Sequence, residues 1–555
     1  MKIYIYRRFC LVAIIVLFSF VDNCLASKIN IPNKHFIKID VTNVDGARLG
    51  VNPGDTVYVE SGHRDYLRFV NIHGDSLNYV IITNYAGKVE VSNDNFLYGI
   101  QIFDCTYFRF TGSGDKNIKY GIRILKTAAK SNGLSLDGSS TNFEIDHLDI
   151  TQTGFAGICA NPKPDCEDKL NRGNFVQRNT VYHDNYIHST WGEAFYIGHS
   201  FYNGYTINCD GVDKFVLPHE LKNVKIYNNV IDSCGYDGIQ VGCATEGCEI
   251  YGNKISYYGA QNEKNQNFGI IIAAGTSGKC YDNFIINGTG NGINVFGLGN
   301  NTIYNNIIIN PGYDFSGKYI TTNSIGIFCD DRGTTTGRYF NFFNNTIISP
   351  KGDGIRFIST ISKNSKICNN LILNPGSLGS YYNNDIDKSY VNYDNTVDLT
   401  VSNNYFSTNT ESIKNLSSPK DVYRYCSHLP VINNGIDISQ YGIIADFNGK
   451  SRKYNDMVDI GAFEYDTIMV PSQKSNSIKV FSNNTQRELL VYSTKKETIE
   501  NIAIYQINGQ KIYSQIPDNK DISIVSTKDI LNRGFYFVYV STQTEESLNK
   551  ICINF

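Results

Sequence analysis

The sequence is short of tryptophan, methionine and positive charge. It has one Trp and three Met in 555 residues, and its 50 Lys and Arg are balanced by 53 Asp and Glu, which gives a formal net charge of −3 at pH 7. No run of Lys or Arg stands out. A nucleic-acid partner requires a basic surface, so we expect none. The length suits one large domain and one small one.

Long apolar runs are confined to the amino terminus. Residues 1–26 carry Lys2, Arg7 and Arg8, then an apolar run, then small residues ending in Ala26. This order is typical of a secretory signal peptide that is cut after Ala26. No later run reaches the roughly 18 apolar residues that a membrane helix needs. We therefore expect an exported, soluble mature protein without a transmembrane anchor.

Metal-site spacings are missing as well. The 14 cysteines form no CxxC pair and no Cys/His cluster of the kind that binds zinc. Two of them leave with the signal peptide, and twelve remain for a compartment that we expect to be oxidising. The local spacing favours two loop bridges, Cys159 with Cys166 and Cys243 with Cys248.

Asparagine and glycine, in contrast, follow a repeat. Residues 222–242 contain an apolar alternation, an Asn pair, a second apolar run, a polar turn and the segment Gly-Ile-Gln-Val-Gly. Copies aligned on the second Asn place that residue at Asn185, Asn229, Asn253, Asn283, Asn306, Asn345, Asn370 and Asn404. The spacings are 44, 24, 30, 23, 39, 25 and 34 residues. A constant core with variable insertions predicts a β-solenoid, and alternation with period two predicts strands.

The Asn column has a physical explanation. Asn tolerates the left-handed backbone that a tight bend requires, and its amide can hydrogen-bond the equivalent Asn one coil away. With this repeat, residues 41–465 resemble the right-handed parallel β-helix proteins, the group that includes the pectate lyases. The resemblance implies an all-β solenoid over residues 27–465, opened by an N-terminal cap within residues 37–111. The segment 459–465, DIGAFEY, resembles one that closes secreted bacterial β-helix domains.

Register along the glycine-containing strands predicts the direction of their side chains. One column should face inward and consists of Phe195, Ile239, Ile270, Ile293, Ile327 and Ile355. Tyr196, Gln240, Asn294 and Arg356 should face outward, where they would bind substrate. Cys280 and Cys329 stand in slots that Ile or Val fills in neighbouring coils, which predicts buried thiols.

The same register brings two carboxylates together. Glu193 and Asp237 precede Ala194 and Gly238 on adjacent coils, which places them about 4.8 Å apart. Carboxylates that close either raise one another's pKa and act as acid and base or nucleophile in glycoside cleavage, or share a cation such as calcium. The alternative is that they only shape turns, since Asp-Gly is a common turn dipeptide.

Two histidines and two long insertions surround this pair. His188 and His199, at the ends of two successive strands, would be proton carriers or substrate contacts; the alternative is a surface or capping role. Residues 161–174 and 199–221 form the longest excursions and flank the strand 193–199. Loops this long in a solenoid are usually functional or disordered.

Cation and lyase chemistry have weaker support. Asp330 and Asp331, followed by Arg332, would bind calcium or an acidic sugar, or form a solvated turn with an internal ion pair; no other cofactor is indicated. A lyase of this fold usually needs a Lys or Arg base and a second cation. Arg123 and Arg356 are predicted on one face but many coils apart, so lyase chemistry is disfavoured.

The last part of the chain lacks the Asn repeat. Residues 466–477 have the composition of a linker, and residues 478–555 contain short strands with an Asn-Gly turn at 508–509 and a basic last strand. The order of these strands resembles the C-terminal sorting domain of the Bacteroidetes type IX secretion system. The resemblance implies a small β-sandwich, contact with the type IX machinery, passage across the outer membrane, and release or attachment at the cell surface.

These features predict a secreted or cell-surface protein that acts on an extended polysaccharide. A β-helix repeats side chains about 4.8 Å apart, which suits a linear polymer. The first hypothesis is glycan cleavage, by hydrolysis or elimination, with Glu193, Asp237 and His199 as the catalytic residues. The second is a non-catalytic carbohydrate-binding or adhesin-like protein in which Glu193 and Asp237 only shape turns.

Overall fold

The computed structural model describes residues 36–313, 315, 324–376, 389–394, 396–408, 416–427, 429–453, 457–465, 477–483, 487–506, 511–517, 520–528, 531 and 534–553. The predicted signal peptide and all but the last residue of the predicted linker lie outside these ranges. Within them, no helix has the length and apolar character needed to cross a bilayer.

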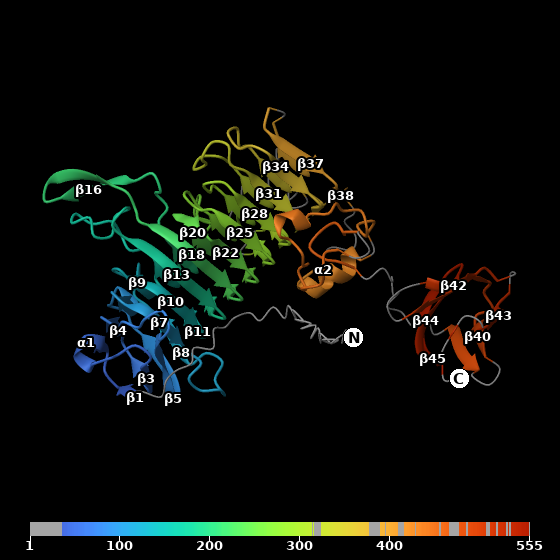
Figure 1. The fold of residues 1–555 in the computed structure, drawn as a ribbon, viewed down its shortest axis with the longest axis horizontal. Helices are drawn as coiled ribbons and strands as arrows, with labels where there is room; N and C mark the ends of the chain where they lie inside the picture. Colours follow the sequence, from blue (N-terminus) through green and yellow to red (C-terminus); the bar gives the residue numbers. More distant parts are fainter. Residues whose placement is uncertain are drawn as a thin grey trace, which may run out of the picture.

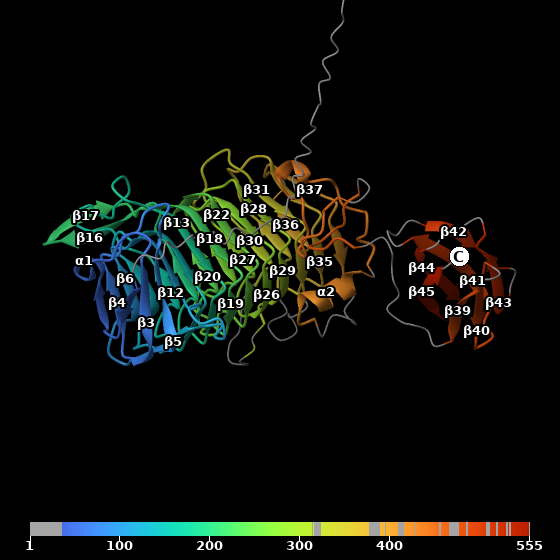
Figure 2. The same ribbon diagram turned by 60° about the horizontal axis from the view of Figure 1, so that its bottom comes forward.

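The large domain is a parallel β-helix, as the repeat predicts. Each coil contributes up to three strands, which stack on the equivalent strands of the next coil in parallel register (Figures 1 and 2). Two of the three stacks belong to one 24-stranded sheet, here called strip A and strip B, and the third is a 12-stranded sheet. Figure 2 shows β12, β20, β27 and β30 of the third stack as one row.

Strip A consists of β1 (Phe36–Ile39), β3 (Thr56–Arg64), β5 (Val80–Ser92), β7 (Thr106–Thr111), β10 (Thr141–Asp146), β13 (Val176–His183), β18 (Glu220–Tyr227), β22 (Cys248–Tyr251), β25 (Gly278–Tyr281), β28 (Asn301–Tyr304), β31 (Phe340–Phe343), β34 (Ser365–Cys368) and β37 (Leu399–Ser402), with the short β21 (Ala244–Glu246) beside β18. Strip B consists of β8 (Ile122–Lys126), β11 (Leu148–Thr151), β14 (Tyr186–His188), β19 (Val230–Asp232), β23 (Lys254–Ser256), β26 (Phe284–Gly288), β29 (Ile307–Pro311), β32 (Thr346–Ile348), β35 (Leu371–Leu373) and β38 (Tyr405–Ser407). The 12-stranded sheet consists of β2 (Asn43–Asp45), β4 (Leu67–Val70), β6 (Tyr98–Phe103), β9 (Asn132–Asp137), β12 (Ile158–Ala160), β15 (Phe195–Ile197), β20 (Ile239–Val241), β24 (Ile270–Ile272), β27 (Ile293–Val295), β30 (Ile327–Cys329), β33 (Ile355–Phe357) and β36 (Val391–Tyr393). A one-turn helix, α1 (Gly46–Leu49), follows β2.

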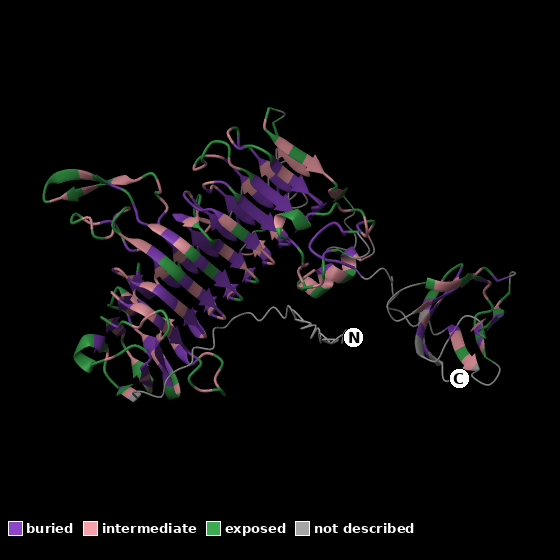
Figure 3. Ribbon diagram, in the orientation of Figure 1, coloured by how far each residue is buried: buried purple, intermediate pink, exposed green. Residues whose placement is uncertain are grey.

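The core is a set of stacked apolar columns. The predicted inward column from Phe195 to Ile355 is paired in register from β15 to β33, and each of its members is fully buried. Buried and partly exposed residues alternate along many strands (Figure 3). The glycine before β20 is needed for close approach, since a Cβ on Gly238 would lie 2.5 Å from the carbonyl oxygen of Gly269. Cys280 and Cys329 are buried thiols, as predicted.

A ladder of asparagine amides runs along the corner between strips A and B. From Asn185 to Asn404, each Asn donates its side-chain N–H to the amide oxygen of the next Asn at 2.9–3.0 Å, and that oxygen also accepts the backbone N–H of the donor residue. The left-handed backbone belongs to the preceding residue, for example Asn228 at φ 54° and Asn305 at φ 55°. The left-handed bend and the amide hydrogen bond, both predicted for one Asn, are thus made by two neighbouring residues.

The DIGAFEY segment does not form a coil. The last coil strand of the described residues is β38. Residues 416–427, 429–453 and 457–465, here called the cover, contain α2 (Pro419–Cys426) and a 3₁₀ turn, η2 (Ser439–Tyr441), and fold back over the outside of the preceding coils. Ile460, Ala462 and Phe463 pack against apolar side chains on the outer face of strip B. The main chain of this segment is also hydrogen-bonded to the β-helix, since the side chain of Asn344 donates to the carbonyl oxygens of Asp459 and Gly461. The outer face of strip B is apolar here because this cover buries it.

Both predicted disulfides are wrong. Cys159, Cys243 and Cys248 are free thiols, and the disulfide in the structure joins Cys166 to Cys209. Cys209 lies on a hairpin formed by β16 (Tyr205–Cys209) and β17 (Val212–Val216), which extends from the body of the β-helix (Figure 1). The bridge therefore ties the two predicted insertions to each other, and we call this pair the arm.

The C-terminal unit has its own core and two antiparallel sheets. One sheet contains β39 (Ile478–Asn483), β40 (Glu488–Ser493) and β43 (Ile522–Ser526). The other contains β42 (Lys511–Gln515), β41 (Ile499–Gln506), β44 (Gly534–Thr542) and β45 (Glu546–Ile553). Side chains from both sheets, including Leu489, Val491, Ile502 and Val538, form one buried cluster. This confirms the small β-sandwich expected after the β-helix.

Removing one rung of the ladder should destabilise the β-helix. Asn283→Ala deletes the bonds to Asn306 and to the carbonyl oxygen of Ile250, and leaves the buried N–H of Asn253 without its acceptor. We expect a loss of about 3 kcal/mol in unfolding free energy, measured by urea denaturation followed by circular dichroism. Lys279→Ala, at an exposed position of the same coil, is the control and should change it by less than about 0.5 kcal/mol. Equal effects of both changes would contradict the stabilising role of the ladder.

Candidate functional site

The predicted outward row exists on the 12-stranded sheet. Register pairs one side chain per coil, and the row consists of Cys159, Tyr196, Gln240, Ile271, Asn294, Phe328 and Arg356. The row is only partly open to solvent: Tyr196 and Arg356 are half-buried, whereas Gln240 and Asn294 are 5% and 1% exposed. A polymer along this face would therefore contact the row at some coils and the flanking loops at others.

Glu193 and Asp237 lie on adjacent coils, as the register predicts. The backbone N–H of Ala194 donates to the carbonyl oxygen of Asp237 at 3.0 Å, which places the two residues at equivalent positions. Both side chains are buried, with 1% and 0% exposure. Oε2 of Glu193 and Oδ2 of Asp237 have no hydrogen-bond partner within the described part of the chain.

Asp237 has a structural role that Glu193 lacks. Its Oδ1 accepts the backbone N–H of Phe268, one coil further on, at 2.7 Å. Asn291 and Asp353, at the equivalent position in later coils, accept the N–H groups of Ile325 and Ser389 in the same way. The turn interpretation therefore accounts for one oxygen of Asp237, but it does not account for Glu193.

Burial dominates the electrostatics of this pair. Desolvation raises the pKa of Glu193 to about 7. Desolvation and the neighbouring Glu193 together raise the pKa of Asp237 well above its ordinary range. Both carboxyl groups therefore hold their protons to a higher pH than exposed carboxyl groups do.

Glu193 lies close to the outward row. Burial together with the charges of Asp137 and Glu193 raises the pKa of the Cys159 thiol, and burial raises that of Tyr196, on which Glu193 also acts. The Tyr196 hydroxyl is 3.1 Å from Oγ of Ser200, which also accepts Nε2 of Gln240 at 3.0 Å. The charge of Glu193 thus acts on two side chains of the outward row, and also on the buried thiol of Cys234.

An exposed aromatic side chain precedes Glu193 by two residues. Trp191 is the single tryptophan of the chain and is 55% exposed. Its backbone is held firmly, because its N–H donates to the carbonyl oxygen of Thr153 and its own carbonyl oxygen packs against Gly235. The next residue, Gly192, donates its N–H to the carbonyl oxygen of Phe155, whose ring contacts those of Tyr196 and Tyr236. Sequence reasoning missed Trp191 because a lone exposed aromatic carries no periodic signal.

Neither predicted histidine is bonded to the carboxyl pair. In the described structure, His199 accepts the N–H of Phe201 and stacks on Tyr205, at the base of the arm. Burial lowers its pKa to about 4, which keeps it neutral at neutral pH. His188 lies on strip B, where its Nε2 is 3.1 Å from Oδ1 of Asp149.

The other predicted substrate and metal residues are engaged in local contacts. Asn294 accepts a hydrogen bond from Asn291, and Arg356 pairs with Asp353 at 2.6 Å. Asp330 pairs with Arg332, whose guanidinium lies over the ring of Phe296.

Asp331 accepts the backbone N–H groups of Thr360 and Ile361. Burial alone would raise its pKa, but these bonds lower it. The turn with an internal ion pair is therefore the arrangement that the structure shows for Asp330 and Asp331.

Arg123 and Arg356 do not share a face. Arg123 lies on β8 of strip B, between Glu90 and Asp149, whereas Arg356 lies on β33 of the 12-stranded sheet. The prediction of a common face was wrong because register within one set of strands gives no information about a different sheet.

An ionic cluster on strip A was also missed. Oxygen and nitrogen atoms of Glu144, Asp146 and His183 lie within 4.8 Å of one another, a spacing that suits a metal ion. The guanidinium of Arg109, however, pairs with both carboxylates, at 2.7 Å from Asp146 and 3.2 Å from Glu144. Burial would lower the pKa of His183, but its bonds to Asp184 and Glu144 raise it to about 9. A cation in this cluster is already supplied by Arg109, so we assign it no metal.

Next to that cluster, strip A carries a tyrosine ladder. Tyr227, Tyr251, Tyr281 and Tyr304 stack face to face, with ring centroids 4.7–4.8 Å apart. The sequence repeat could have predicted this stacking, because each of these tyrosines stands two positions before a ladder asparagine.

Comparison with known proteins finds solved structures of similar fold, but it does not identify a family for this chain. No family model and no curated protein matches the sequence. A solved pectate lyase matches 79% of this chain and 98% of its own, with 13% identity and a TM-score of 0.41. An alginate lyase from a Paenibacillus species matches 66% and 98%, with 13% identity and a TM-score of 0.33. A family 6 polysaccharide lyase from Pseudopedobacter saltans matches 69% and 97%, with 12% identity and a TM-score of 0.33. No activity follows from likeness at this level.

The buried pair should make stability depend on pH. The folded state keeps the proton of Glu193 up to about pH 7, whereas an unfolded glutamic acid releases it near 4.5, so the folded state loses stability as pH rises between these values. Glu193→Gln should match the wild type at pH 4.5 and exceed its unfolding free energy by up to about 3 kcal/mol at pH 8. Glu263→Gln, an exposed change, is the control. A Glu193→Gln difference that stays constant across this range would show that the carboxyl group is not desolvated.

Proposed function

We propose that this protein acts on an extended polysaccharide that lies along the outer face of the 12-stranded sheet and is held around Tyr196. The observation that carries the proposal is the register-aligned outward row, with a carboxyl group beside it at Glu193. Strand spacing of about 4.8 Å makes such a row linear, and a linear row suits a polymer better than a compact ligand.

Trp191 and Tyr196 supply the aromatic contacts. Sugar rings pack their C–H faces on aromatic rings, and an exposed indole on a rigid backbone offers such a surface at low entropic cost. Ser200 and Gln240 supply hydroxyl and amide groups next to Tyr196. The arm lies along the same end of β15, because His199, Ser200 and Phe201 lead from that strand into the hairpin.

Cleavage would use the two carboxyl groups in different protonation states. Asp237, whose pKa burial and Glu193 raise well above its ordinary range, is suited to donate a proton, and Glu193, with a pKa of about 7, is suited to act as base or nucleophile. Because both groups are buried, cleavage also requires that bound substrate displace part of their cover.

Non-catalytic binding is the second candidate. The burial of Glu193 and Asp237 favours it, since neither carboxyl group is open to a polymer in this structure. In that case the aromatic and amide groups of the row bind the glycan, and the carboxyl pair only shapes the turn.

We also propose that residues 1–26 direct export and that residues 478–555 are a type IX sorting domain that brings the protein to the cell surface. The separate antiparallel β-sandwich with its own core supports this assignment, because it has the fold that the sequence resemblance implies.

Binding and cleavage can be measured on one panel of neutral and uronic-acid polysaccharides. We expect the fluorescence of Trp191 to change on binding, and Tyr196→Ala to weaken binding about tenfold or more. Tyr85→Ala, at a more exposed aromatic on β5, is the control and should bind normally. A panel without any fluorescence change or binding would reject the proposal.

On the same panel, new reducing ends would show hydrolysis, and reducing ends with absorbance from an unsaturated uronide would show elimination. Glu193→Gln should then lower the rate about 100-fold or more. Full activity in this variant would remove Glu193 from the chemistry, and binding without products in the wild type would favour the non-catalytic candidate.

Removal of residues 478–555 should stop surface delivery in a host with a type IX system. We expect the truncated protein to remain in the periplasm, as measured by cell fractionation and surface proteolysis. As a matched control, residues 466–555 fused to a periplasmic reporter should carry the reporter to the surface. Surface delivery of the truncated protein would refute the assignment.

A further inference from the structure

We propose that a cavity on the outer face of strip A binds a single carboxylate-bearing sugar ring, at a site separate from the 12-stranded sheet. The cavity has a volume of about 180 Å³. It lies between β34 and β37, at the C-terminal end of the β-helix, and the segment 436–441 of the folded-back cover forms its outer wall. Pockets for drug-sized ligands start at about 300 Å³, so this one suits one ring rather than a longer ligand.

The floor of the cavity continues the tyrosine ladder. In the strand register, Tyr304 pairs with Phe343, which is followed in the next two coils by Cys368 and Ser402. The cover then adds Tyr441, whose ring lies 4.7 Å from that of Phe343 at an angle of 33°. Tyr441 is half-buried, so one part of its ring packs on the ladder while the rest lines the cavity. An aromatic surface of this kind suits the apolar face of a sugar ring.

The polar groups of the cavity include one uncompensated cation. Lys366 lines it from β34 and, within the described part of the chain, has no ion-pair or hydrogen-bond partner. Asp437 also lines the cavity, but its charge is paired with Lys453 at 3.0 Å, and Asp398, next to β37, is paired with Lys363 at 4.0 Å. An incoming carboxylate would therefore meet a lysine charge that neither of these carboxylates neutralises.

The remaining groups match sugar hydroxyls. Thr400, Ser402 and Gln440 offer hydroxyl and amide groups to the cavity. Asp437 stays ionised, because the backbone N–H of Ser439 and the ammonium group of Lys453 lower its pKa to about 2, so it can accept hydroxyl protons. The wall is anchored, since the side chain of Asn369 bonds both the N–H and the carbonyl oxygen of Ile436. The site is therefore formed before a ligand arrives.

Saturation-transfer NMR on the full-length mature protein tests the proposal with the methyl glycoside of galacturonic acid and its neutral counterpart, methyl galactoside. We expect saturation of the uronide ring protons by the wild type, and binding at least about tenfold weaker for Lys366→Gln and for Tyr441→Ala. The neutral glycoside should bind at least about tenfold more weakly than the uronide.

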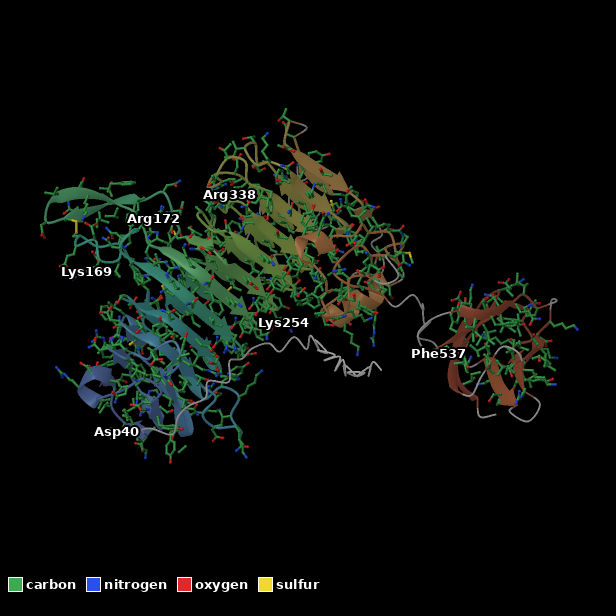
Figure 4. The ribbon with its side chains drawn as sticks, viewed as in Figure 1. Asp40, Lys169, Arg172, Lys254, Arg338 and Phe537 are labelled. Atoms are coloured by element: carbon green, nitrogen blue, oxygen red, sulfur yellow. A yellow bond between two sulfur atoms is a disulfide. The ribbon has the colours of Figure 1, made fainter. Side chains whose placement is uncertain are left out.

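Two matched variants separate this site from the rest of the molecule. Lys225→Gln removes an exposed lysine of the same row of strip A, five coils away, and should bind the uronide like the wild type. Lys254→Gln removes an exposed lysine of strip B (Figure 4) and should also keep the signal. Absence of uronide binding by the wild type, unchanged binding by Lys366→Gln, or loss of binding in Lys254→Gln would each overturn the proposal.

Discussion

The β-helix depends on buried amides that must be satisfied from one coil to the next. Each ladder asparagine donates to the next coil and accepts from the previous one, so no member can be moved without leaving a buried polar group unpaired. The chain between two rungs can vary from 23 to 44 residues while the amide bonds keep almost the same length. Register is thus held at one corner, and length variation is confined to the other sides of the coil.

That division between a fixed corner and variable loops positions the candidate site. Because the strands of the 12-stranded sheet follow the corner and pair in parallel register, their outward residues line up from coil to coil. The longest insertions flank β15, where the Cys166–Cys209 bridge holds them together. Glu193, in the same coil, is an exception to the rule that buried polar atoms are hydrogen-bonded, because its carboxyl group is buried and one of its oxygens has no partner in the described residues. Such departures are expected at functional positions, where stability is given up for chemistry or binding.

Much of the fold could be predicted because the sequence repeat determines the coils and their register. The aligned asparagines, the inward column from Phe195 to Ile355 and the outward Tyr196 all follow from period and register. The Cys166–Cys209 bridge could not be predicted, since its partner stands 43 residues away on a hairpin whose position depends on loop packing. The cover has no repeat and so gave no signal. Register placed Glu193 beside Asp237, but it does not show how far a side chain is buried, so the burial of both carboxyl groups could not be predicted.

The folded-back cover also determines where a mechanical force applied to the C-terminal unit enters the β-helix. Beyond Tyr465 the chain continues to the linker and the C-terminal unit, so a pull on that unit reaches the β-helix through residues 459–465. These residues are bonded sideways to Asn344, Thr346 and Asn369, in coils that precede the last one. The force therefore enters across several rungs at once and loads them in shear, and the terminal coil, β36 to β38, is not peeled off first. A solenoid that ended in its last coil would instead unravel from that end, one strand at a time.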